Sequence, residues 1–138
     1  MIHFKDDYPA QVIKNAKAFA RALANQGLQI EGDPDSDFTE THQVLLRTAR
    51  GQGEHVADRL EANNIITNPQ AYLDDPSFAV ASGVRMGSQE MTRFGMKERD
   101  FEEFAALLAE IIGDVAGKDR RDEVKAFRQR FIEMQYCF

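Results

Sequence analysis

The sequence has little of what marks a secreted or membrane-bound protein. Its one cysteine, Cys137, stands near the C-terminal end, which excludes a disulfide framework and indicates an inert or exposed thiol. No apolar run approaches the roughly 20 residues that a membrane-spanning helix needs. The opening MIHFKDDYP lacks the basic and apolar regions of a signal peptide. We therefore expect a cytoplasmic protein with no membrane partner.

Positive charge, metal-ligand spacing and nucleotide loops are also scarce. The 17 basic residues are outnumbered by 23 acidic ones, and the net charge of -6 argues against a nucleic-acid partner. His3, His42 and His55 are scattered, with no His-x-x-His or Cys-x-x-Cys spacing, so we expect no metal site. Gly51-Gln52-Gly53 lacks the rest of any phosphate-binding motif. We assign no catalytic residue to this chain.

The apolar content of the sequence is sufficient for one independent core. The 138 residues are 43% hydrophobic, include ten Phe, and show no interdomain linker, internal repeat or low-complexity segment. A chain of this length buries about two-thirds of its unfolded surface when it folds. We therefore expect a single domain over residues 1–138 that folds without disulfide bonds.

Apolar periodicity predicts four helices and four short strands. The clearest helix lies between Lys97 and Val115, where apolar residues recur at the spacing of a helix face packed on a core. The stripe that follows Pro9 has similar spacing and stops at Gly27. The expected helices are 7–27, 54–63, 97–115 and 119–134, the expected strands are 28–30, 42–47, 65–67 and 79–86, and the loops include 31–37 and 68–77.

The order of these elements favours an α+β fold. The strands are short, and the chain has no long series of strand–helix–strand units. Such a pattern predicts a small, mainly antiparallel sheet with helices packed on one face.

One charged residue stands out from the solvated surface. Arg85 lies in the segment Ala81-Ser82-Gly83-Val84-Arg85-Met86-Gly87, flanked by apolar residues and glycines. An arginine stays charged and needs an anionic or carbonyl partner wherever water is excluded. The residues alone leave two interpretations open. Arg85 forms a structural ion pair with one of the acids, or it binds the carboxylate of a ligand through its two-pronged donor group.

At this segment the chain resembles the C-terminal small domain of serine hydroxymethyltransferase, a fold-type I enzyme that uses pyridoxal phosphate. Residues 82–87, SGVRMG, resemble the family's S-G-[IV]-R-[IVL]-G motif. Other motifs of the family occur in the same order along the chain. They are YPAQVIKNAK at 8–17 for Y-x-x-Q-V-x-x-N-A-K, THQV at 41–44 for T-x-x-H-L-V, TRFGMKE at 92–98 for T-x-R-G-F-x-E, and VKAFRQRF at 124–131 for the terminal helix.

The resemblance implies a role for three residues. Arg85 corresponds to the family's arginine that binds the α-carboxylate of glycine or serine, and Ser82 and Gly83 shape the backbone around it or contact the substrate. The implied fold is the α+β C-terminal domain of fold-type I pyridoxal-phosphate transferases. Fixing the amino acid's orientation is the protein's part in such a reaction, because the cofactor itself stabilises the carbanion.

The resemblance also implies that the active site is completed by another domain. The family's large domain supplies the lysine that binds the cofactor, in a T-T-T-H-K context absent here, and Lys14, Lys97 and Lys125 are ordinary helix-surface residues. Pyridoxal phosphate is therefore expected only when a large domain is present, in the parent chain or as a separate partner. The chain is expected to be inactive alone, as an excised domain, a split subunit or a relic.

Two departures from the family pattern bear on the reaction. An N-x-N pattern near the family's folate site becomes Thr67-Asn68-Pro69-Gln70, and the G-T-P-A sequence becomes Gly87-Ser88-Gln89-Glu90. A folate-independent aldolase or transaldolase therefore stays an alternative, as does a standalone amino-acid-binding or interaction module. Because the domain packs on a large domain in the parent architecture, we also expect an exposed apolar surface that favours a partner or a homo-oligomer.

Overall fold

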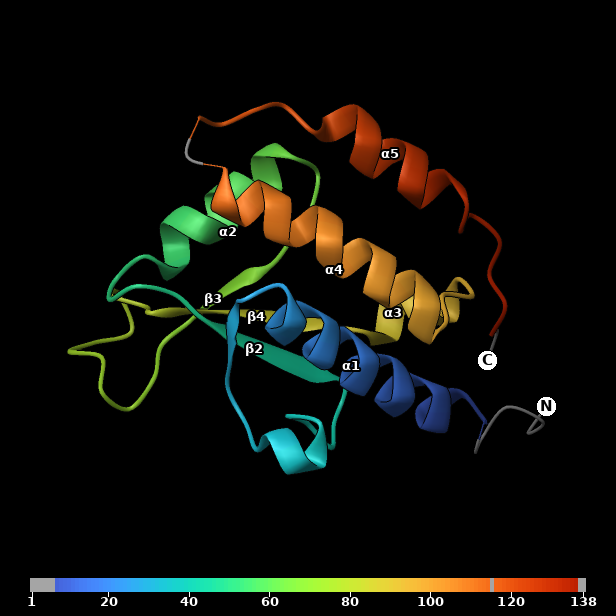
Figure 1. Cartoon of the computed structure of the whole chain (residues 1–138), viewed down its shortest axis with the longest axis horizontal. Coiled ribbons are helices and arrows are strands. Elements are labelled where there is room, and N and C mark those ends of the chain that lie inside the picture. The colour runs from blue at the N-terminus through green and yellow to red at the C-terminus, as the bar shows by residue number, and fades with distance from the viewer. Residues whose placement is uncertain (1–6, 115, 137–138) are drawn as a thin grey trace.

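The computed structural model describes residues 7–114 and 116–136, which form one sheet and the helices that cover it (Figure 1). The predictions made for His3, Val115 and Cys137 lie outside the described residues. In chain order the elements are α1 (Asp7–Asn25), β1 (Gln29–Ile30), the 3-10 helix η1 (Pro34–Ser36), β2 (Gln43–Arg47), α2 (Gly53–Ala62), β3 (Asn68–Gln70), β4 (Gly83–Gly87), α3 (Gln89–Arg93), α4 (Glu98–Gly113) and α5 (Arg121–Gln129).

The sheet has the strand order β1-β2-β4-β3, and each neighbouring pair is antiparallel. At its centre Val44 lies opposite Met86, and Leu46 lies opposite Val84. These four side chains are buried in the core with the helices, because alternate residues of a strand point to opposite faces. The expected α+β fold, a mainly antiparallel sheet with helices on one face, is confirmed.

The helices form a layer on the sheet with one further helix outside it. α1 and α2 contact the strands, and α4 packs against both of these helices. α5 is the outermost helix, and its Phe127 ring lies 5.4 Å from the Phe104 ring of α4, centroid to centroid (Figure 1). The stripe that predicted α4 does face the core, and its buried members are Phe101, Ala105, Leu108 and Ile111.

The structure corrects the position of the third strand. The apolar residues Ile65 and Ile66 predicted a strand at 65–67, but the strand β3 is Asn68–Gln70, inside a segment expected to be a loop. Ile65 instead lies just past α2 and caps its end, because its N–H donates to Leu60 O at 2.9 Å and its side chain is buried. Asn64 adopts a left-handed conformation with φ 64°, which commonly ends helices. Ile65 and Ile66 therefore belong to the segment that ends the helix and not to a strand.

Other element boundaries differ for local reasons. β4 begins at Gly83 and not at residue 79, because the preceding residues anchor a turn in which Ala81 O accepts from Gly53 N at 2.8 Å. The short helix α3 is not indicated by the sequence, since its few residues cannot display a helical period. Residue 113 is the last of α4, and α5 ends at Gln129 and not at residue 134.

A buried amide ties α1 to the segment between α3 and α4. Asn15 is fully buried, and its Nδ2 donates to Thr92 Oγ1 and to Met96 O, each at 2.8 Å. Its Oδ1 accepts from Gln11 Nε2, also at 2.8 Å. Both amide hydrogens are therefore used, and removing them would leave buried acceptors without partners.

We expect Asn15→Ala to lower the free energy of unfolding by about 1–3 kcal/mol, the usual cost of unsatisfied buried polar groups. Urea denaturation followed by circular dichroism measures the change. Lys14→Ala is the control, because the neighbouring Lys14 side chain is exposed. Equal stabilities for the two variants would contradict this account of the Asn15 amide.

Candidate functional site

Arg85 lies on the face of the sheet that the helices leave uncovered. It follows the buried Val84 and precedes the buried Met86, and it is itself exposed. Its neighbours in register are Leu45 on β2 and Asn68 on β3, so Arg85 lies on an inner strand, with a strand on either side. Directly paired residues share a face of an antiparallel sheet, which places Leu45 and Asn68 beside Arg85.

The Arg85 guanidinium has no protein partner within the described chain. It makes no hydrogen bond and no ion pair with any residue that the structure describes. The ion-pair interpretation therefore finds no support among these residues. Because the group stays charged, it is available to an anion that approaches the open face.

A second arginine on the same face shows the opposite behaviour. Arg47, at the end of β2, is bound by Glu31 through Nε and by Asp74 through a terminal nitrogen at 3.0 Å. The hydrogen bond to Glu31, followed by that to Asp74, raises the pKa of Arg47, and the hydrogen bond from Arg47 lowers the pKa of Asp74. Arg47 is therefore committed to a structural network, whereas Arg85 is not.

Gly83 is required by a ring packed against it. A Cβ at this position would stand 2.8 Å from the Tyr72 hydroxyl oxygen and would overlap the ring edge. The Arg47 guanidinium lies over the Tyr72 ring, 4.1 Å from the ring centroid. The Tyr72 hydroxyl is buried without a hydrogen-bond partner among the described residues, and burial raises its pKa to about 12. Gly83 thus lets an aromatic side chain cover the sheet next to Arg85.

Ser82 anchors the start of β4. Only 3% exposed, it donates through Oγ to Asp75 Oδ1 and accepts at Oγ from Gly51 N at 2.9 Å. Its N–H donates to Asp75 Oδ2 at 2.9 Å. Ser82 and Gly83 therefore shape the strand that carries Arg85, and direct substrate contact by either residue stays a prediction.

Three loop residues near this site were not indicated by the sequence. Tyr72, Asp74 and Asp75 lie in a segment that the sequence marks only as a proline-containing loop. Tyr72 and Asp74 contact Arg47, more than 20 positions earlier, and Asp75 contacts Ser82 across the loop, and no local spacing encodes these contacts. The Asp-Asp-Pro sequence signals a turn and nothing more.

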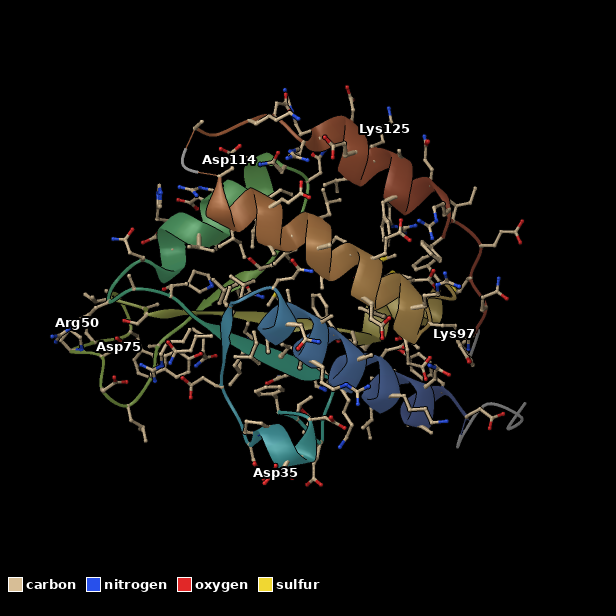
Figure 2. The ribbon with its side chains drawn as sticks, viewed as in Figure 1. Asp35, Arg50, Asp75, Lys97, Asp114 and Lys125 are labelled. Atoms are coloured by element: carbon tan, nitrogen blue, oxygen red, sulfur yellow. The ribbon has the colours of Figure 1, made fainter. Side chains whose placement is uncertain are left out.

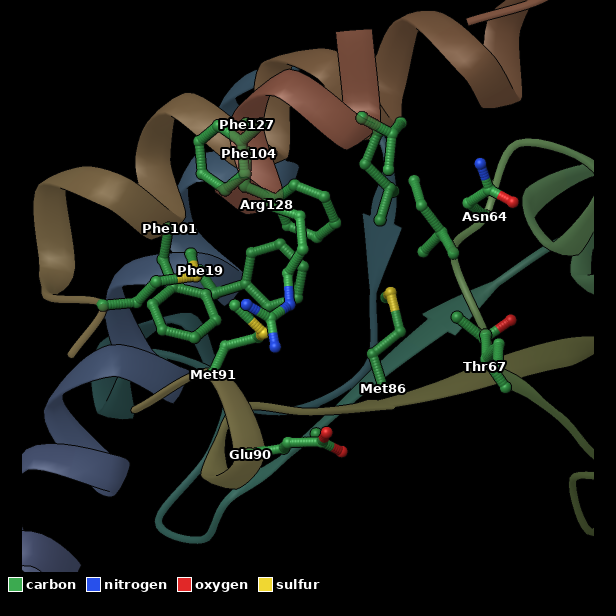
Figure 3. Close-up of a pocket in the computed structure, with 16 residues that line it drawn as sticks. Phe19, Asn64, Thr67, Met86, Glu90, Met91, Phe101, Phe104, Phe127 and Arg128 are labelled. Atoms are coloured by element: carbon green, nitrogen blue, oxygen red, sulfur yellow. The ribbon is translucent and has the colours of Figure 1, made fainter. Parts of the chain in front are cut away.

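A cavity of about 370 Å³ lies on the other side of the sheet (Figure 3). Its walls are mainly core side chains from α1, α4 and α5, with Met86 of β4, while Arg128 and Glu90 also line it. The Thr67 hydroxyl is buried there without a hydrogen-bond partner among the described residues. Arg85 is not among the lining residues, so the apolar cavity and the charged face are separate features.

The loop between β3 and β4 (residues 71–82, the β3–β4 loop) exposes large apolar side chains beside the open face. Leu73 is fully exposed, Phe78 is 92% exposed, and Val80 is partly exposed. Ile66, just before β3, is 84% exposed. Several large apolar side chains are thus exposed near this end of the domain, and exposed apolar patches are typical of interaction sites.

No three His, Cys, Asp or Glu side chains gather in residues 7–114 and 116–136 as a metal site would require. Over the same residues, no helix combines the length and the apolar character needed to cross a bilayer.

The family model of serine hydroxymethyltransferase matches residues 2–108. Serine hydroxymethyltransferases from Pyrobaculum aerophilum and Sulfolobus acidocaldarius are each 42% identical to this chain, over 139 and 142 residues, and each match takes in 100% of the chain. The matched segments cover only 32% and 33% of those two proteins, so the chain spans about a third of the length of the curated relatives it matches.

Among solved structures, the chain is similar to the crystal structure of L-threonine transaldolase from Pseudomonas fluorescens. The TM-score is 0.76 and the identity 32%, over 94% of this chain and 29% of that one. The fold is thus that of an α+β domain from a fold-type I pyridoxal-phosphate enzyme. Together with the family match, this shows that the chain belongs to the serine hydroxymethyltransferase family.

The contact between Gly83 and Tyr72 predicts a coupling between two substitutions. We expect Gly83→Ala to lower the free energy of unfolding by about 1–3 kcal/mol, because the added methyl overlaps a ring that Arg47 covers. In a Tyr72→Ala background the same change should cost much less. A double-mutant cycle measured by urea denaturation checks this. Equal costs of Gly83→Ala in the two backgrounds would show that the ring does not dictate the glycine.

Proposed function

We propose that this chain is the small domain of a serine hydroxymethyltransferase-like pyridoxal-phosphate enzyme and that its Arg85 binds the α-carboxylate of an amino-acid substrate. The observation that carries the proposal is the exposed guanidinium of Arg85, which has no partner among the described residues and projects from the open face of the sheet. It lies within residues 82–87, which match the family's carboxylate-binding motif. Leu45 and Asn68 flank it in register.

The chemistry of a guanidinium suits this role. Its planar, two-pronged donors match the two oxygens of a carboxylate, and it keeps its charge at any physiological pH. Placed on a rigid inner strand, Arg85 fixes the direction from which the substrate carboxylate is held. Holding one end of the amino acid orients the bond to be broken at its other end.

The cofactor would be held by a partner domain and not by this chain. Lysines among the described residues lie on helices or beside them, namely Lys14 and Lys17 on α1, Lys97 before α4, and Lys118 and Lys125 before and on α5. Figure 2 shows Lys97 and Lys125 far from the end of the molecule that carries Arg50 and Asp75. No described lysine is therefore on a strand, beside Arg85. Pyridoxal phosphate supplies an electron sink when bound, and we infer that this chain is inactive without a large domain.

The partner surface is the open face of the sheet together with the β3–β4 loop. Exposed Leu73 and Phe78 supply apolar contact area there, and Arg85 lies on the adjoining face. A domain that docks here would bring its cofactor toward the guanidinium of Arg85. The chain's match to only a third of its relatives supports such a missing partner.

A transaldolase-type reaction is the second candidate. Its support is the similarity to L-threonine transaldolase, together with the absence of the family's second asparagine near Asn68. Both reactions need the same carboxylate contact, so Arg85 serves either one. Tetrahydrofolate-dependent turnover of serine would favour the hydroxymethyltransferase, and folate-independent exchange of threonine with an aldehyde would favour the transaldolase.

The test mixes the full chain with the cofactor-loaded part of the Pyrobaculum aerophilum relative that this chain does not match. We expect glycine to change the visible absorbance of bound pyridoxal phosphate only when both parts are present. Arg85→Ala should weaken the apparent glycine affinity roughly tenfold to a hundredfold, the usual worth of charge-assisted hydrogen bonds. Arg85→Lys should recover part of this loss, since it keeps the charge and loses the two-pronged geometry.

Arg99→Ala is the matched control, because Arg99 is exposed on α4, away from the open face. It should leave the glycine response unchanged. An unchanged glycine affinity in Arg85→Ala would refute the carboxylate role. Calorimetric binding of glycine to the chain alone, without pyridoxal phosphate, would favour a standalone amino-acid-binding module instead.

A further inference from the structure

We propose that Asp75 is the positioning residue for Arg85. This inference rests on the proposed function. The Asp75 carboxylate accepts three hydrogen bonds, with Oδ2 taking the N–H groups of Tyr72 at 2.8 Å and Ser82 at 2.9 Å, and Oδ1 taking the Ser82 hydroxyl. One side chain thereby joins the two ends of the β3–β4 loop.

The same contact reaches a third segment. Ser82 Oγ, which donates to Asp75, accepts from Gly51 N in the turn between β2 and α2. In the same place Thr48 N donates to Ser82 O at 2.9 Å. The Asp75 carboxylate therefore sits at the junction of the β3–β4 loop, the β2–α2 turn and the start of β4 (Figure 2). Ser82 immediately precedes β4 and stands three positions before Arg85, so the junction sets the direction in which β4 begins.

The Asp75 carboxylate anchors the loop together with the Tyr72 ring packed on Gly83 and the hydrogen bond from Gly53 N to Ala81 O. The apolar side chains of Leu73 and Phe78 are exposed and bury no surface against the domain. Asp74 is tied to Arg47, but its own side chain is 70% exposed, and exposed ion pairs contribute little. The Asp75 contacts, by contrast, include the hydroxyl and the N–H of the buried Ser82.

A carboxylate is the group that this junction needs. It is an acceptor only, and here it meets three donors and no cation in contact among the described residues. The Ser82 hydrogen bond, followed by that from the Tyr72 backbone, lowers the pKa of Asp75. The ionised form is therefore the one that holds the junction. An asparagine would keep one acceptor for the two N–H groups, but its Nδ2 would face the Ser82 hydroxyl and reverse that hydrogen bond, and the negative charge would be lost.

The consequence for Arg85 is geometric. A strand advances by about 3.3 Å per residue, so a tilt at Ser82 moves the Arg85 guanidinium relative to a docked partner. A misplacement of about 1 Å can cost roughly a hundredfold in an oriented reaction. Asp75 does not touch the substrate in this account. It acts by fixing the strand from which Arg85 reaches out.

The first experiment uses the full chain alone and needs no cofactor. Amide hydrogen exchange is followed by nuclear magnetic resonance at Tyr72, Ser82 and Gly51. In Asp75→Ala we expect these amides to exchange at least roughly tenfold faster, since their acceptors are lost or freed. Asp74→Ala, the matched control next to it, should leave them protected. Unchanged protection in Asp75→Ala would overturn the proposal.

The second experiment repeats the glycine titration of the mixed proteins. Asp75→Ala should weaken the glycine affinity roughly tenfold with Arg85 intact, and Asp74→Ala should not. Asp75→Asn keeps one of the two acceptor oxygens, so its glycine affinity should lie between those of Asp75→Ala and Asp74→Ala. This variant replaces Asp75→Ala in the test if Asp75→Ala does not fold. Asp75 variants that bind glycine as Asp74→Ala does would overturn the positioning role while Arg85→Ala still weakened binding. If Arg85→Ala had no effect either, the proposed function itself would fail.

Discussion

The alternation of side chains along β4 is the constraint on which the rest of the domain depends. Val84 and Met86 point to the helices and join the core, and Arg85 between them must point the other way. A shift of one residue in the pairing of β2 with β4 would bury the guanidinium and expose the core. The packing energy of the core thus holds the functional residue on the open face. No further interaction is needed to orient Arg85 toward the open face.

The two arginines on the open face, Arg47 and Arg85, differ in their partners. Arg47 forms ion pairs with Glu31 and Asp74 and lies over the Tyr72 ring, at one end of the sheet. Arg85, on the neighbouring strand, makes no hydrogen bond or ion pair with the described residues. An exposed arginine without an ion pair costs no stability, because water solvates it, and the guanidinium stays available to a carboxylate.

The sequence predicted correctly those elements that are determined by the spacing of residues within the element itself. The α4 stripe through Phe101 and Leu108 predicted a helix and its buried face, and the glycine-flanked segment singled out Arg85. It misplaced β3, because the apolar pair Ile65–Ile66 belongs to the end of a helix. It also passed over Asp75, since an aspartate in a turn looks the same whether it faces water or holds Ser82, seven positions on.

The central claim is that the open face of the sheet, with Arg85 on it, receives a cofactor-bearing partner domain. The most direct measurement is a nuclear magnetic resonance titration of the labelled full chain with the cofactor-loaded large-domain segment of the Pyrobaculum aerophilum relative. The account predicts that shifts concentrate on β3, β4, the β3–β4 loop and the Arg85 side chain, while α4 and α5 stay unchanged. Shifts confined to α4 and α5, or no shifts at saturating partner, would contradict it.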